Sequence, residues 1–286
     1  MNAPQQPTGF VIRGVSNAHY QASPGLSTSG MKMLMKSPAT YHYWSQWQRP
    51  HKDVYDFGTI VHTLCLGHGD PYVELPFDSY RSRAAQDARD EARAAGLIPC
   101  LPGTLTQAKE CADAVLSHPS AGPLFLDVLG DDELSMWWDD PDTGVRLKAR
   151  ADRAAAWQSQ LVDLKTTNDA SPRGFARDAF KYGYHIQRAV YGEVFARTHG
   201  LDHDAVRFLF VAVEKTPPYL VCVHELGEDE VRMGREAMQH AIRLYAECSE
   251  TGVWTGYPDT VQPLTFPTWA HMQHEEDLGI DYEIEV

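Results

Sequence analysis

The sequence has few cysteines and no long apolar run, and these two absences exclude several classes of protein. Only 5 of its 286 residues are cysteine, and no two of them form a Cys-x-x-Cys pair. An odd number of scattered cysteines argues against a disulfide framework or a four-cysteine metal site. No apolar run approaches the roughly 18 residues that cross a bilayer, and the first residues do not resemble a secretory signal. We therefore expect a cytoplasmic protein with no membrane association.

Positive charge is also scarce. The chain holds 25 Lys and Arg against 39 Asp and Glu, a formal net charge of −14. This balance excludes a simple basic protein that coats nucleic acid. The charge is uneven, however, because residues 146–197 carry 10 basic and 5 acidic residues while both flanking segments are acidic. The sequence therefore leaves room for one local site at which phosphates could bind.

The order of the predicted elements indicates an α/β (α+β) fold with a helical N-terminal portion. We predict an N-terminal arm over residues 1–25, a single domain over 26–270 and an acidic tail over 271–286. Apolar spacing and end signals predict helices, and short alternating runs predict strands. The predicted helices cover residues 27–37, 56–67, 79–95, 104–117, 171–199 and 228–248, and the predicted strands cover 133–140, 145–153, 160–167, 206–216 and 219–226.

The chemically informative stretch is the pair of predicted strands from Gly144 to Thr167. Alternation places Arg146, Lys148, Arg150 and Asp152 on one face of the first strand, and Asp163 and Lys165 on one face of the second. A turn near Trp157 would set Asp152 about opposite Asp163, with Cβ atoms roughly 5 Å apart. Two carboxylates at that distance call for a cation. Mg²⁺ fits because it takes oxygen ligands from carboxylates and phosphate.

Taken alone, an Asp-x-Lys triplet is common and a solvated sheet face with mixed charges explains it. The set is more informative, because an acid lies eleven residues upstream on the matching face with basic residues beside it. His62, within the apolar segment 56–67, is by itself typical of a hydrogen-bonded core histidine. Gln187 and Tyr191 share a helix face, and without further information they form a partly buried polar pair.

These segments together resemble the PD-(D/E)-x-K nuclease superfamily and, within it, the RecE type, the nuclease domain of exodeoxyribonuclease VIII. Four stretches between about residues 26 and 270 carry the resemblance: 26–41 for the N-terminal helix, 58–62 for Gly-x-x-x-His, 143–153 with 163–167 for the catalytic strands, and 187–191 for Gln-x-x-x-Tyr. Ala151 stands where the family pattern has Pro, and Asp163 stands where many members have Glu. The resemblance implies a central mixed sheet flanked by helices.

The resemblance also implies roles for individual residues. Asp152 and Asp163 would bind Mg²⁺, for which Mn²⁺ could substitute, with help from the Leu164 carbonyl. Lys165 would be the catalytic lysine. Further expected residues are His62 and Glu133 at the metal site, Gln187 and Tyr191 facing it, and Arg146, Lys148, Arg150 and Arg188 as DNA contacts.

The implied activity is metal-dependent digestion of linear double-stranded DNA from 5′ ends. It would leave 3′ single-stranded overhangs for a RecT-like annealing protein, and the resemblance implies a homo-oligomeric ring around the DNA. Polarity, processivity and ring formation come from the resemblance and not from residue spacing.

Three alternatives stand beside this interpretation. The first is a RecB-like or other PD-(D/E)-x-K nuclease with endonuclease or single-strand activity; members that hold an iron–sulfur cluster need a cysteine cluster that this sequence lacks. The second is a non-catalytic DNA-binding or assembly protein that keeps the fold, which the presence of Asp152, Asp163 and Lys165 disfavours. The third is a zinc hydrolase, suggested by 13 histidines but lacking a His-Glu-x-x-His motif.

Overall fold

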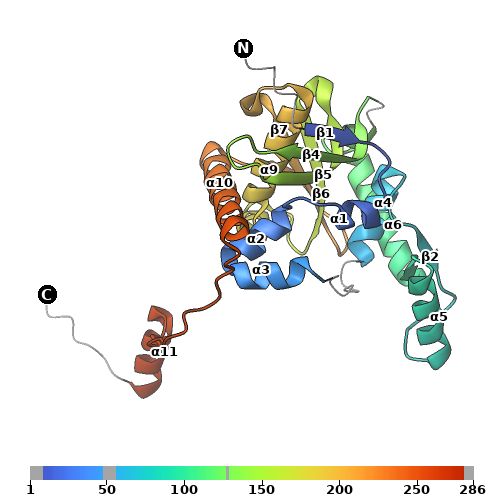
Figure 1. The fold of residues 1–286 in the computed structure, drawn as a ribbon. Helices are drawn as coiled ribbons and strands as arrows, with labels where there is room; N and C mark the ends of the chain where they lie inside the picture. Colours follow the sequence, from blue (N-terminus) through green and yellow to red (C-terminus); the bar gives the residue numbers. More distant parts are fainter. Residues whose placement is uncertain (1–8, 48–55, 127–128, 280–286) are drawn as a thin grey trace, which may run out of the picture.

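The computed structural model of the chain describes residues 9–47, 56–126 and 129–279. Figure 1 shows a sheet with helices on both faces. The strands are β1 (Gly9–Ile12), β2 (Tyr72–Glu74), β3 (Ile98–Cys100), β4 (Asp131–Asp139), β5 (Arg146–Ala155), β6 (Gln160–Thr167), β7 (Arg207–Glu214) and β8 (Val221–Glu225). The helices are α1 (Asn17–Ala22), α2 (Thr28–Lys36), α3 (Pro38–Ser45), α4 (Asp56–Leu66), α5 (Arg83–Ala94), α6 (Pro102–Ser117), α7 (Gly122–Leu126), α8 (Pro172–Tyr182), α9 (Tyr184–His199), α10 (Glu228–Thr251) and α11 (Thr268–Leu278), with 3-10 turns η2 (Ala156–Gln158) and η3 (His203–Ala205).

The main sheet has six strands in the order β1-β4-β5-β6-β7-β8. Only β6 and β7 run parallel, and the crossover between them is formed by α8 and α9. The other neighbours are antiparallel. A parallel pair inside an otherwise antiparallel sheet, with helices on both faces, confirms the predicted α/β class with a central mixed sheet.

Each face of the sheet has its own core. On one face, Leu147, Ala149 and Ala151 of β5 pack with buried residues of α9 and α10. On the other face, Val162 and Leu164 of β6 pack with buried residues of α4 and α6. The apolar residues named in β5 therefore pack on one face of the sheet, and those named in β6 pack on the other. This arrangement places α9 and α4 on opposite sides of the same two strands.

Local signals explain where the helices begin and end. Ser27 caps α2 by accepting a hydrogen bond from the backbone N–H of Gly30. Gly200 ends α9 in the left-handed conformation that favours glycine. The predicted helical stretch over residues 171–199 bends at Gly183, as a glycine inside it indicates: Gly183 has φ +69° and divides the stretch into α8 and α9. This break reorients α9 so that it crosses the sheet.

Residues 9–22 contribute one strand to the main sheet and one helix that packs against it. Strand β1 pairs with β4, so that Phe10 lies opposite Trp137 and their rings stack with centroids 5.1 Å apart. Helix α1 follows, and its Tyr20 is buried. This part of the predicted arm is thus integrated into the domain, and residues 1–8 lie outside the described residues.

At the other end of the chain, α11 lies apart from the sheet (Figure 1). It spans the predicted boundary between residues 270 and 271, and its side chains are mostly exposed. Residues 280–286 of the predicted acidic tail lie outside the described residues. Within the described residues, no helix is both long and apolar enough to span a membrane.

Candidate active site

The site forms where β5 and β6 separate. Their ladder pairs Ala155 with Gln160 and ends at Arg153 opposite Val162, around the predicted turn. Continuing this register by one residue places Asp152 opposite Asp163, as the sequence predicts. The two strands part there, and the backbone N–H of Leu164 donates instead to Oδ2 of Asp152 at 2.7 Å. A side chain thus replaces a backbone partner at the opening of the hairpin.

The neighbouring ladder is interrupted at the same level. β4 and β5 pair Asp132 with Arg153 and Leu134 with Ala151, but the register omits Glu133 and Asp152. We call this gap the broken rung. Because Ala151 and Ala154 pack in the same core although they are three residues apart, strict alternation fails between them. The break in alternation lies beside Asp152, whose carboxylate contacts His62 of α4, on the side of the sheet opposite the core that contains Ala149 and Ala151.

Asp163 is fixed from both sides. Its Oδ1 accepts a hydrogen bond from the side-chain amide of Gln187 on α9 at 2.5 Å. Its Oδ2 lies 2.5 Å from Nζ of Lys165 and is buried without a hydrogen-bond donor in aligned geometry among the described residues. The structure thus brings Asp163, Lys165 and Gln187 together as predicted, with one carboxylate oxygen held by an ion pair alone.

Asp152 is held from the other side of the sheet. Nε2 of His62, on α4, lies 2.9 Å from Oδ2 of Asp152. Burial opposes charging of the His62 ring, but the carboxylates of Asp152, Asp163 and Glu133 raise its pKa to about 9. His62 is therefore a charged partner of the site and not an isolated core histidine.

The two aspartates differ in their acidity. Burial raises the pKa of Asp163 to about 6, although Lys165 opposes the shift. Burial also acts to raise the pKa of Asp152, but His62, Lys165 and the N–H of Leu164 lower it overall. Burial would lower the pKa of Lys165, yet the two carboxylates raise it, so that the lysine stays charged. Two anions and two cations therefore share a partly buried site.

Glu133 and Tyr191 complete the predicted set. Glu133 accepts a hydrogen bond from Nη2 of Arg150, and its charge is felt by His62. Burial raises the pKa of Tyr191 well above its ordinary value, with both aspartates contributing and a hydrogen bond from the backbone of Arg150 opposing. Tyr191 is therefore a neutral hydroxyl beside the site.

Tyr184 belongs to the site although sequence reasoning did not select it. Nζ of Lys165 lies 4.8 Å from the centre of the Tyr184 ring. Burial raises the pKa of Tyr184 to about 12, against the effect of Lys165. Tyr184 lies one helical turn before Gln187, so the spacing of polar residues along this helix could have indicated it.

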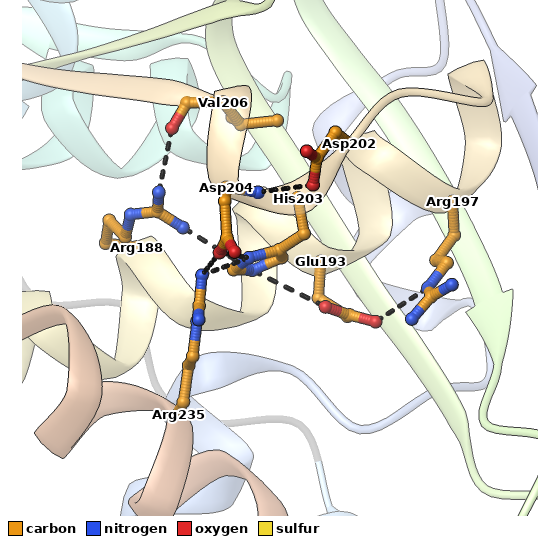
Figure 2. Close-up of polar contacts among 8 residues, drawn as sticks. All are labelled: Arg188, Glu193, Arg197, Asp202, His203, Asp204, Val206 and Arg235. Carbon is orange, nitrogen blue, oxygen red and sulfur yellow. Dashed lines mark hydrogen bonds and ion pairs between the residues drawn. The ribbon is translucent and has the colours of Figure 1, made fainter.

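Two predicted DNA contacts are buried elsewhere. Nζ of Lys148 donates to the backbone carbonyls of Tyr20, Gln21 and Ser23 at 3.0, 3.1 and 2.7 Å. Figure 2 shows the guanidinium of Arg188 turned toward Val206, whose carbonyl accepts a hydrogen bond at 2.7 Å. Their placement gives both residues structural contacts in place of the predicted contact with DNA, because alternation along a strand or helix does not reveal burial.

The basic segment 146–197 is also less open than its composition suggests. Several of its cations are held in ion pairs: Arg146 with Asp139, Arg150 with Glu133, Arg153 with Asp132, Lys165 with Asp163 and Arg197 with Glu193. Arg173, Arg177 and Lys181 of α8 are exposed. The face of α8 is thus the exposed basic surface of this segment.

The donor set at the site suits a divalent cation. Two carboxylates, one with an oxygen held only by an ion pair, offer hard oxygen ligands. An imidazole also suits Mn²⁺. Within the described ranges no group of three or more His, Cys, Asp or Glu side chains is arranged so that it could hold a metal ion. In this structure each carboxylate is paired with a cation, Asp152 with His62 and Asp163 with Lys165.

An Asp-x-Lys strand paired to a second acidic strand, within a mixed sheet covered by helices, defines the PD-(D/E)-x-K superfamily. A family model described as "PDDEXK-like domain of unknown function (DUF3799)" matches residues 27–264. The chain belongs to this family. A search of curated proteins found no match.

A solved structure supports the fold. A protein from Eubacterium rectale, provisionally described as an exonuclease, superposes with a TM-score of 0.60 at 14% sequence identity, over 90% of this chain and 96% of the other. A second structure, SSO0001, reaches a TM-score of 0.31 at 14% identity, over 74% of this chain and 85% of the other, which is too low to support an argument. The family and the site together support a nuclease.

Proposed function

We propose that the protein is a metal-dependent exodeoxyribonuclease that degrades linear double-stranded DNA. The observation that carries the proposal is the partly buried grouping of Asp152, Asp163 and Lys165, with His62 and Gln187 from opposite faces of the sheet. A surface with mixed charges would not bury these groups, because an unpaired buried charge is costly. Perturbed pKa values at one place further indicate a reactive site.

Asp152, Asp163 and the backbone carbonyl of Leu164 would hold a divalent metal ion, of the kind that PD-(D/E)-x-K nucleases generally use. When bound, Mg²⁺ or Mn²⁺ would supply an activated water and Lewis-acid stabilisation of phosphate charge. Lys165 remains protonated beside Asp163 and contributes a fixed positive charge for the reacting phosphate. Gln187 keeps Asp163 oriented, and the exposed cations of α8 offer a surface for the DNA backbone.

The finer parts of the proposal rest on the resemblance to the RecE type. They are digestion from the 5′ end, a 3′ overhang for a RecT-like annealing protein, and a homo-oligomeric ring. Light scattering of the purified protein measures its oligomeric state, and a monomer would contradict the ring.

Digestion of end-labelled DNA tests the activity. With Mg²⁺, the wild type should degrade a linear duplex and release a 5′ label before a 3′ label. The Asp163→Asn and Lys165→Met variants should lose more than about a hundredfold in rate. Asp142→Asn, in the exposed turn between β4 and β5, is the matched control and should retain activity.

Three outcomes would overturn parts of this proposal. Full activity of Asp163→Asn would remove the site assignment. Cleavage of a closed circular duplex would favour an endonuclease. Binding of DNA without any digestion in Mg²⁺ or Mn²⁺ would favour a non-catalytic DNA-binding protein.

A further inference from the structure

Three exposed cations lie along one face of α8. Arg173, Arg177 and Lys181 are spaced by four residues, so that they follow one side of the helix at intervals of about 6 Å. Unlike the arginines of β5, none of the three forms an ion pair within the part of the chain that the structure describes. A row of unpaired cations of this kind fits the phosphates of a nucleic acid strand.

An exposed aromatic ring lies at the C-terminal end of this row. Tyr182 is 45% exposed, and Nζ of Lys181 lies 5.1 Å from the centre of its ring. The same ring lies 6.0 Å from that of Tyr184, with an angle of 31° between the two planes. Because Nζ of Lys165 lies 4.8 Å from the centre of the Tyr184 ring, Tyr182 connects the row of cations to the proposed site.

The backbone that carries Tyr182 is held in place. Gly183 ends α8 in the left-handed conformation, and Nζ of Lys32, on α2, donates to the carbonyl of Tyr182. The Lys32 side chain lies directly against Gly183, since a Cβ added to this glycine would be 2.7 Å from Cδ of Lys32. An aromatic ring on a fixed backbone loses little conformational entropy when it binds a ligand. The position of Tyr182 is therefore set before any ligand binds.

The chemistry of this surface matches a nucleic acid strand. An aromatic face beside a row of cations is the combination that binds single-stranded DNA, because bases stack on the ring while phosphates pair with Lys and Arg. Inside a duplex both faces of a base are covered by its neighbours, so only a terminal or unpaired base can stack on the ring. An apolar protein partner would leave the three cations of α8 without counter-charges. The ligand that fits is therefore a DNA strand with one base exposed.

We infer that Tyr182 is a stacking platform for a terminal or unpaired nucleobase, and that the DNA strand reaches the site along the cations of α8. The inference rests on the proposed nuclease function and adds to it the part of the DNA that the protein recognises. That part is a base at a strand end, bound through its aromatic face and without sequence preference. Tyr182 binds the DNA and takes no part in the hydrolysis.

Binding of short strands to the full chain in EDTA tests the inference without digestion. The probes are a single-stranded DNA and an abasic strand of the same length, which keeps the phosphates but carries no bases. By fluorescence anisotropy, the wild type should bind the strand with bases about 5–100-fold more tightly than the abasic strand, as stacking of one base on one ring predicts. Tyr182→Ala should lose that preference. Tyr182→Phe should keep most of it, because the ring remains.

The dependence of binding on salt separates the ring from the cations. For a single strand, each phosphate contact contributes a slope of about −0.7 when the logarithm of the affinity is plotted against the logarithm of the salt concentration. Arg177→Gln should therefore reduce the slope by up to about 0.7 for both strands. Tyr182→Ala should leave the slope unchanged, because it removes no charge. A variant that only distorted α8 would change the slope as well.

Phe180→Ala is the matched control. Phe180 is the other exposed aromatic residue of α8, but its ring stacks with that of His185 at 6.0 Å and lines the groove between α8 and α10. The Phe180→Ala protein should bind both strands as the wild type does. The same measurements in Mg²⁺, with each variant combined with Asp163→Asn to prevent digestion, cover the case in which binding of DNA needs the metal.

A wild type that binds both strands equally would overturn the inference, as would a Tyr182→Ala protein that keeps the preference for bases. An equal loss in Phe180→Ala would also overturn it, because any exposed ring of α8 would then suffice. A wild type that shows the preference but digests no DNA in Mg²⁺ or Mn²⁺ would overturn the proposed function alone. A protein that binds neither strand in either condition would overturn the inference, and digestion of a linear duplex would still decide the proposed function.

Discussion

Gln187 and Asp163, 24 residues apart in the sequence, meet in a buried hydrogen bond from Nε2 to Oδ1. The contact joins α9 to β6 at the point where the hairpin opens. It leaves the other oxygen of Asp163 to the ammonium of Lys165. The amide of Gln187 therefore fixes the rotation of the carboxylate, which decides where its second oxygen points.

Replacing Gln187 should lower activity more than stability. Gln187→Ala removes the donor to Asp163, and we expect the rate of DNA digestion to fall about 10–100-fold because the carboxylate is no longer oriented. Rates under saturating Mg²⁺, with the thermal midpoint measured in parallel, provide the test. Gln107→Ala on the exposed side of α6 is the control. An unchanged rate for Gln187→Ala would show that Gln187 does not contribute to DNA digestion at the site.

His62 should make the stability of the metal-free protein depend on pH. Because its folded pKa of about 9 lies above the ordinary 6.5, its stabilisation is fully present below pH 6.5 and is lost as the pH rises through about 9. The contribution is on the order of 3 kcal/mol at most. In urea unfolding with EDTA, the free energy of unfolding of the wild type should exceed that of His62→Gln by the largest amount at pH 6. The difference between the two free energies should be smaller at pH 9.5.

The exposed His240 of α10 provides the control for this experiment. His240→Gln should follow the wild type at every pH. A difference between the wild type and His62→Gln that stays constant from pH 6 to pH 9.5 would show that the charge on His62 does not contribute.

Lys148 should contribute to the stability of the fold and not to DNA binding. Lys148→Met removes the ammonium that three carbonyls of α1 and the following turn share, and we expect the free energy of unfolding to fall by about 2 kcal/mol or more. The exposed Lys109→Met should change it by less than about 0.5 kcal/mol. Unfolding in urea measures both. Weaker DNA binding with unchanged stability in Lys148→Met would restore the role in DNA contact.

The sequence predicted the local elements well because their signals are local. The cap at Ser27 and the left-handed Gly200 set the ends of helices through contacts within a few residues. The hairpin register, which ends at Arg153 opposite Val162 beside the two aspartates, follows from the length of the turn. Gly183 likewise marks a bend within residues 171–199, although its φ of +69° is known only from the structure.

The sequence by itself therefore determined the class of fold, since period-2 patterning and turn signals define the strands, and it proposed Asp152, Asp163 and Lys165 as the acid, acid and lysine of the site. Only the tertiary structure decided which charges serve the site. Lys148 and Arg188 are bonded to distant carbonyls, whereas His62 and Gln187 reach the aspartates from opposite faces of the sheet. Burial and long-range pairing decide these roles, and neither is encoded in the spacing of residues along one strand.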